Sequence, residues 1–235
     1  MITRAVVVPH PPLLVPELVA GAAAQTAAVR DACLAATGEL ARHARDWIAI
    51  GAASAAAVIE PGVRASFRGF GVDVPVALSD GVAPGQPADL PLPALVAGWL
   101  RERAGARSVR VELVPFTASQ AECVALGERL SSVRDDVGLL VLGDGSNRHE
   151  TAPPGWTDAR ASDFDGKVAA ALAGADPEAL LAVDHALAAE LGVQGLTPWW
   201  VLAGLARAAP HWRGRLLYSD APLGVAYHVA AWERR

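Results

Sequence analysis

The residues best suited to chemistry lie in one short stretch, 143–150, which directly follows an apolar run at 139–142. Such a run predicts a buried strand, and α/β proteins bind ligands at the carboxyl ends of their strands. The stretch supplies carboxylate, hydroxyl, amide and imidazole groups, which can bind a small polar ligand or move a proton. These groups belong to Asp144, Ser146, Asn147, His149 and Glu150.

A further candidate, His10, lies between prolines at the end of another apolar run, residues 6–8. Because proline fixes the backbone angle φ, this loop is expected to be rigid and to present the imidazole to a metal ion or a substrate proton. The alternative is a histidine that only hydrogen-bonds within its own loop. Two polar loops at two strand ends predict one shared site.

The residues of the 143–150 stretch also have structural interpretations. Asp144, Ser146 and Asn147 are of the types that commonly satisfy backbone groups in tight turns, and that use is the more frequent one. His149 and Glu150 are candidate metal ligands, but neighbouring residues in an extended loop point in opposite directions. We therefore expect at most one of these two residues to bind a metal.

Other polar residues are weaker candidates. Gln194 follows an expected helix, where its amide either reaches a pocket or only ties down the turn. The histidines expected to be solvated or satisfied, and so outside the site, are His43, His185, His211 and His228.

The elements that must position these residues follow from hydrophobic periodicity and turn residues. The expected strands are 6–8, 47–50, 74–78, 109–114, 139–142, 216–219 and 225–231. Helices are expected at 23–44, 93–103, 164–172 and 179–191. Two more helices are expected, one that follows a capping box at Ser119 and Glu122 and ends near residue 133, and one that begins at Thr197 and Pro198. Helices that alternate with strands predict an α/β fold with a central, mostly parallel sheet flanked by helices. We expect a single domain, residues 1–235.

Composition excludes several classes of function. A net charge of −5 without a basic run argues against a nucleic-acid or anionic-membrane surface. No apolar run approaches the length of a membrane span and no signal peptide is recognisable, so a cytoplasmic protein is expected. Cys33 and Cys123 form no CxxC pair, which argues against a disulfide or a thiolate zinc site and predicts two core residues.

Taken together, these stretches resemble the catalytic-subunit superfamily of class III extradiol dioxygenases, the LigB-like and Memo-like group, over nearly the whole chain. The segment around His10 resembles the family's first strand and first histidine, and residues 143–148 are similar to its Gly-Asp-Leu-Ser-His-Arg signature. Further matches in the family's order are Pro154-Gly155-Trp156, Phe164-Asp165, residues 181–184 and residues 195–204. The resemblance implies a LigB-like dioxygenase fold.

The resemblance also implies a chemistry that this chain does not fully support. The family opens catechol rings with O₂ at a non-haem Fe(II) held by two histidines and a carboxylate, with another histidine as acid/base. His10 matches the first ligand, whereas the second falls near Ala53, the acid/base at Asn147 and the third ligand at Gln194. One histidine and two amides are too weak a set to hold Fe(II).

We therefore expect a homologue with a degraded iron site that binds a small molecule or performs different chemistry. Catalytic roles fall to His10 and Asn147, and ligand binding to Asp144, Ser146, Gln194 and His149. No cofactor is expected; Fe(II) or Zn(II) would require a rebuilt site. The alternatives are an active dioxygenase in which His149 or Glu150 replaces the lost ligands, and a non-catalytic partner subunit. We expect the protein to form a homodimer or to pair with another subunit, whichever of these functions it has.

Overall fold

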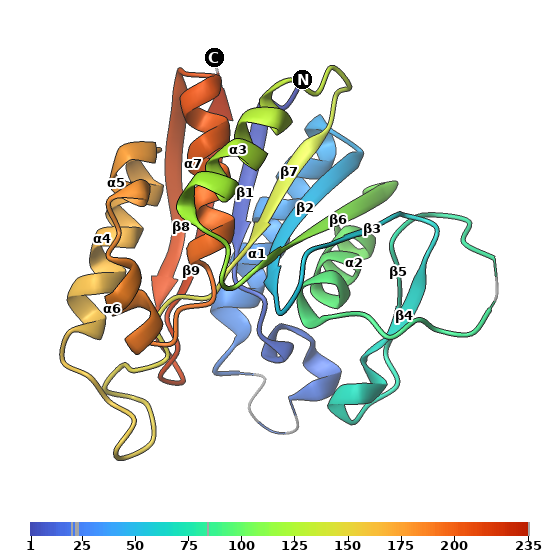
Figure 1. Ribbon diagram of the computed structural model, residues 1–235. Coiled ribbons are helices and arrows are strands. Elements are labelled where there is room, and N and C mark those ends of the chain that lie inside the picture. Colours follow the sequence, from blue (N-terminus) through green and yellow to red (C-terminus); the bar gives the residue numbers. More distant parts are fainter. Residues whose placement is uncertain (20, 22–23, 84, 235) are drawn as a thin grey trace.

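The computed structural model describes residues 1–19, 21, 24–83 and 85–234 (Figure 1). Its main sheet has seven strands in the order β3-β6-β2-β7-β1-β9-β8. Four neighbouring strands are parallel: β6 (Ser108–Pro115), β2 (Asp46–Ala53), β7 (Gly138–Leu142) and β1 (Arg4–Val8). The antiparallel strands at the two sides are β3 (Ala57–Ile59), β9 (Tyr227–Arg234) and β8 (Trp212–Asp220). The expected α/β class with a mostly parallel central sheet is confirmed.

Helices cover both faces of this sheet, and each face has its own hydrophobic cluster. On one face α1 (Ala27–His43) and α2 (Leu92–Ala104) pack against the strands. The helices on the other face are α3 (Gln120–Ser131), α4 (Ala161–Gly174), α5 (Pro177–Leu181), α6 (His185–Glu190) and α7 (Leu196–Ala208). Because β1, β2 and β7 are buried on both faces, they appear in the sequence as apolar runs, whereas β6 is partly exposed and alternates apolar with polar residues.

The chain between β2 and α2 forms a small excursion at one side of the sheet (Figure 1). It contains β3, a 3₁₀ turn at Phe67–Phe70, and a two-stranded sheet of β4 (Arg64–Ser66) and β5 (Pro75–Ala77), the latter packed against α2. The strand expected at 74–78 is present, but it is shorter than expected and covers only Pro75–Ala77.

Most element boundaries agree with the sequence patterns, but the helix expected at 179–191 is wrong. The structure has two helices there, α5 and α6, because the Asp184 carboxylate accepts a hydrogen bond from the Leu187 N–H and so begins a new helix. The capping box before α3 is confirmed by reciprocal hydrogen bonds between Ser119 and Glu122.

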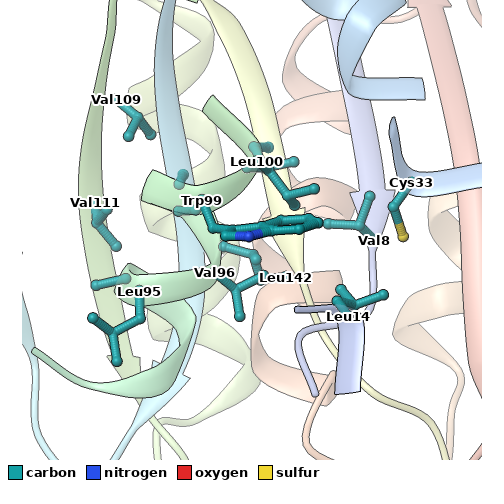
Figure 2. Packing of buried hydrophobic residues seen from close by; sticks show 14 of the residues in the cluster. Val8, Leu14, Cys33, Leu95, Val96, Trp99, Leu100, Val109, Val111 and Leu142 are labelled. Atoms are coloured by element: carbon teal, nitrogen blue, oxygen red, sulfur yellow. The ribbon is translucent and has the colours of Figure 1, made fainter. Parts of the chain in front are cut away.

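The core lies directly beneath the strand ends that carry the candidate site. Figure 2 shows Trp99 of α2 lying beside Val8 and Leu142, the last residues of β1 and β7. All three side chains are fully buried. Burying large apolar side chains at this position fixes the ends of both strands, at about 1.5 to 3 kcal/mol for each side chain.

Both cysteines are buried and free, as the sequence predicts. Burial raises the pKa of Cys123 to about 11 and also raises the pKa of Cys33. Both thiols are therefore protonated at neutral pH. Among the described residues, no helix combines the length and apolar character that crossing a bilayer requires.

Candidate functional site

His10 and Asp144 meet where the parallel neighbours β1 and β7 end. The pairing of the two strands continues one step past β7, because the Gly143 N–H donates to the Val8 carbonyl at 3.0 Å. The His10 backbone N–H then donates to Asp144 Oδ1 at 2.8 Å. The His10 side chain is 1% exposed, and its Nδ1 lies 3.6 Å from the same carboxylate oxygen with no hydrogen-bond partner among the described residues. Asp144 thus fixes the His10 loop.

The carboxylate of Asp144 also affects its surroundings electrostatically. Burial, followed by the negative charge of Asp144, raises the pKa values of the Cys33 thiol and the Tyr227 phenol. Asp144 is itself 8% exposed.

The loop after β7 is held on both sides by backbone hydrogen bonds. The Gly145 N–H donates to the Ala226 carbonyl, and the Ala226 N–H donates to the Ser146 carbonyl, each at 2.8 Å. On the other side, the Asp144 carbonyl accepts the N–H groups of Gln194 at 3.1 Å and Gly195 at 2.8 Å. This last pair explains why residues 144 and 194, remote in sequence, belong to one site.

Close backbone packing makes this arrangement depend on glycine. A Cβ atom at Gly143 would lie 2.4 Å from the Gly195 Cα, and one at Gly195 would lie 2.3 Å from the Trp199 ring. A side chain at Gly143 would require the Gly195 backbone to move, and one at Gly195 would require the Trp199 ring to move. Ser146 is fully buried, and its Oγ accepts the Arg148 N–H at 3.1 Å, the turn-forming use of serine.

Asn147 and Gln194 line one cavity of about 370 Å³, here named the Asn147 pocket. Its other lining residues are Phe116, His185, Ala188, Ala189, Gly192, Val193, Leu196 and Thr197. Asn147 Oδ1 and Thr197 Oγ1 are buried and have no hydrogen-bond partner in the described part of the chain. Gly192 leaves room for the amide, since a Cβ there would lie 2.5 Å from Asn147 Oδ1.

The sequence analysis expected His10 to share this site, but the residues lining the Asn147 pocket do not include it. His10 reaches the pocket only through Asp144, whose side chain binds the His10 loop and whose carbonyl binds Gln194. His185, which we placed outside the site, is part of the lining. Its position at the start of α6 follows from the break at Asp184, which the sequence analysis missed.

His149 lies at a second cavity of about 360 Å³, here named the His228 pocket. His149 Nε2 is 2.8 Å from Asp165 Oδ2, and His228 Nε2 is 3.3 Å from Asp165 Oδ1. The other ring nitrogen of His228 is 3.0 Å from Ser219 Oγ. The Ser146 N–H also donates to Asp165 Oδ1, at 3.1 Å.

His228 has partners on both ring nitrogens, in agreement with its interpretation as a satisfied histidine. The sequence analysis did not predict those partners, because they come from β8 and α4. It also expected His149 and Glu150 to point apart, yet both line the His228 pocket. The chain is not extended there, since the His149 carbonyl accepts the Ala152 N–H at 2.8 Å in a turn.

The positions that the resemblance aligns with iron ligands do not supply a set of metal donors in the described part of the chain. Ala53, at the end of β2, has no donor side chain, and Asn147 and Gln194 offer neutral amides. No group of three or more His, Cys, Asp or Glu residues is placed to hold a metal within the described ranges. The alternative ligand His149 has its Nε2 hydrogen-bonded to Asp165. This donor set does not fit Fe(II), which prefers imidazole and carboxylate.

Comparison with known proteins gives structural likeness without a function. No family model matches the sequence, and no curated protein matches it. Among solved structures, the chain resembles an uncharacterized protein from Escherichia coli K12, with a TM-score of 0.57 and 13% sequence identity over 98% of this chain and 99% of that one. At this identity, the likeness shows a shared fold over the full length of both chains.

Proposed function

We propose that this protein is a divergent relative of the class III extradiol dioxygenases that binds a small, uncharged phenol-like molecule in the Asn147 pocket. In this proposal the iron-binding side chains have been replaced, and the strand-end cavity remains as a ligand site. The α/β fold and the motif resemblance around residues 10 and 144 support a common origin with that family.

A single observation carries the proposal: two buried polar atoms without described partners, Asn147 Oδ1 and Thr197 Oγ1, belong to residues that line the same cavity. An unsatisfied buried polar group costs about 1 to 3 kcal/mol. A ligand that hydrogen-bonds both atoms recovers much of that cost, whereas a purely structural pocket gains nothing by keeping them unpaired.

The lining also limits the chemical class of the ligand. The lining contains no Asp, Glu, Lys or Arg side chain, and Phe116, Val193 and Leu196 supply apolar surface. An aromatic or aliphatic ring with one or two hydroxyl groups matches this lining, because a hydroxyl both donates and accepts hydrogen bonds. Carboxylated or phosphorylated ligands would bring a charge that no lysine or arginine of the lining neutralises.

Calorimetric titration with catechol tests this proposal, with 1,2-dimethoxybenzene as the matched compound that lacks hydroxyl donors. We expect catechol to bind and the dimethoxy compound to bind about tenfold more weakly, because each net hydrogen bond contributes about 1 kcal/mol. Asn147→Ala should weaken catechol binding by a similar factor. Gln86→Ala, which removes an exposed amide elsewhere, should not change it.

Equal affinity of the two compounds, or unchanged catechol affinity in Asn147→Ala, would contradict the proposal. Failure of both compounds to bind would also contradict it.

Restoring the lost donors is expected to create metal binding. The combined substitutions Ala53→His, Asn147→His and Gln194→Glu introduce imidazole and carboxylate groups at the positions that the resemblance aligns with the family's donors, and a partial set leaves the metal underligated. We expect the triple variant to hold Fe(II) more tightly than the unmodified protein in anaerobic equilibrium dialysis. Stoichiometric Fe(II) retained by the unmodified protein after a chelating wash would show that its own donors suffice.

A further inference from the structure

We propose that Ser219, His228 and Asp165 form a separate catalytic site, which hydrolyses small uncharged or cationic esters in the His228 pocket. The three side chains form a continuous chain of contacts: Ser219 Oγ lies 3.0 Å from His228 Nδ1, and His228 Nε2 lies 3.3 Å from Asp165 Oδ1. A hydroxyl, an imidazole and a carboxylate connected in this order activate the hydroxyl as a nucleophile. This proposal is independent of the Asn147 pocket.

The hydrogen bonds at Asp165 determine which nitrogen of His228 acts as the base. In the proposed arrangement Asp165 Oδ1 is the acceptor, so His228 Nε2 carries the proton of the hydrogen bond between them. The opposite nitrogen, Nδ1, then has a free lone pair and faces the Ser219 hydroxyl. His149 and the Ser146 N–H also donate to Asp165 and hold the carboxylate in position.

Secondary structure and packing hold the two reacting side chains together. Ser219 of β8 and His228 of β9 are directly opposite partners in the antiparallel ladder, so their side chains share one face. The His228 side chain is 1% exposed, and its ring lies 6.2 Å from the Trp199 ring, centroid to centroid. Ser219 is exposed, which leaves the hydroxyl open to a substrate.

The His228 pocket provides the remaining parts of such a site. Ser219, His228 and Asp165 all line it, together with Ser162 in the first turn of α4. The N–H groups of a first helical turn lack intrahelical partners and favour negative charge, which suits an oxyanion. Glu150 and Asp220 at the same cavity are exposed carboxylates, which repel an anionic substrate and attract a cationic one.

The reaction that this arrangement supports is ester hydrolysis in two steps. Ser219 Oγ attacks the ester carbonyl carbon while His228 Nδ1 takes the hydroxyl proton. The C–O bond to the leaving alcohol breaks, and the alcohol takes that proton from Nδ1. A water molecule then attacks the acyl-Ser219 carbonyl and gives one proton to Nδ1. Release of the acid returns the proton to Ser219 Oγ, so that one ester and one water yield one acid and one alcohol.

Labelling with a fluorophosphonate followed by peptide mass spectrometry tests the nucleophile directly in the unmodified protein. We expect a stoichiometric label on Ser219, with none in Ser219→Ala and full labelling in Ser54→Ala, which removes an exposed serine remote from the pocket. The same Ser219→Ala variant should lose the hydrolysis of p-nitrophenyl acetate. A label elsewhere, no label, or hydrolysis that survives Ser219→Ala would overturn the proposal.

Asp165 acts here as a positioning residue, and Asp165→Asn tests that role with a readout other than stability. The amide can donate to His228 Nε2 and so leave Nδ1 protonated and unable to accept the Ser219 proton. We expect kcat for p-nitrophenyl acetate to fall by about 10³-fold or more with little change in KM, in protein that still unfolds cooperatively. An unchanged kcat would contradict the roles assigned to Asp165, His228 and Ser219.

Acetylthiocholine should be hydrolysed with a higher kcat/KM than its uncharged isostere 3,3-dimethylbutyl thioacetate, and the reverse preference would contradict the proposed substrate class.

Discussion

Asp165→Ala is expected to lower the free energy of unfolding by about 3 kcal/mol or more, because it leaves several buried donors without an acceptor. The Asp165 carboxylate accepts hydrogen bonds from the Ser146 N–H, His149 Nε2 and His228 Nε2. Asp165 is 4% exposed and His228 is 1% exposed, so the lost acceptor belongs to a largely buried group of hydrogen bonds.

Asp163→Ala is the matched control for this prediction. Asp163 is exposed and lies in the first turn of the same helix, α4. Its carboxylate forms no hydrogen bond or ion pair with the described residues and is favoured there by the helix dipole, so its removal should cost less than about 1 kcal/mol. Urea denaturation of both variants measures the difference. Similar, small losses in the two variants would mean that Asp165 does not hold the His228 pocket together.

Gly127→Ala is expected to have an effect of similar size, through the contact between α3 and α7. A Cβ atom at Gly127 would lie 2.1 Å from the Val201 carbonyl oxygen, and one at Gly204 would lie 2.4 Å from the Val124 carbonyl oxygen. The two helices therefore touch backbone to backbone, and an added methyl group must separate them. Overpacking of this kind costs about 3 kcal/mol. Because α7 carries Thr197, the Asn147 pocket should also change shape.

Gly38→Ala provides a control of opposite sign. Gly38 lies within α1, and a Cβ there meets no atom within 4 Å. Alanine in an open helical position stabilises a helix by about 0.5 to 1 kcal/mol relative to glycine. Thermal unfolding should give a higher midpoint for Gly38→Ala and a much lower one for Gly127→Ala. A Gly127→Ala protein as stable as the parent would refute the close approach of the two helices.

The sequence was sufficient to predict the sheet and the strand ends that carry the candidate residues. Buried parallel strands are continuous apolar runs, and each candidate loop directly follows one of them, at residue 8 and residue 142. The link between Asn147 and Gln194 was also expected, through the family resemblance. The structure supplies its physical cause, the Gln194 N–H bond to the Asp144 carbonyl.

The sequence could not predict the His228 pocket, because its parts meet only through long-range pairing. Ser219 and His228 become neighbours through the register of β8 and β9, and Asp165 reaches them from α4. No local spacing encodes these contacts. The separation of His10 from the Asn147 pocket was equally hidden, since it depends on the Asp144 carboxylate turning toward the His10 backbone N–H.

A crystal structure of the protein with catechol, grown from protein exposed to Fe(II), distinguishes direct ligand binding in the Asn147 pocket from binding through a metal ion. We expect a catechol ring in the Asn147 pocket, with a hydroxyl within hydrogen-bond distance of the Asn147 amide and no metal between the ligand and the protein. Catechol chelated to a metal that His10 holds would contradict it, as would an Asn147 pocket without catechol at a saturating concentration.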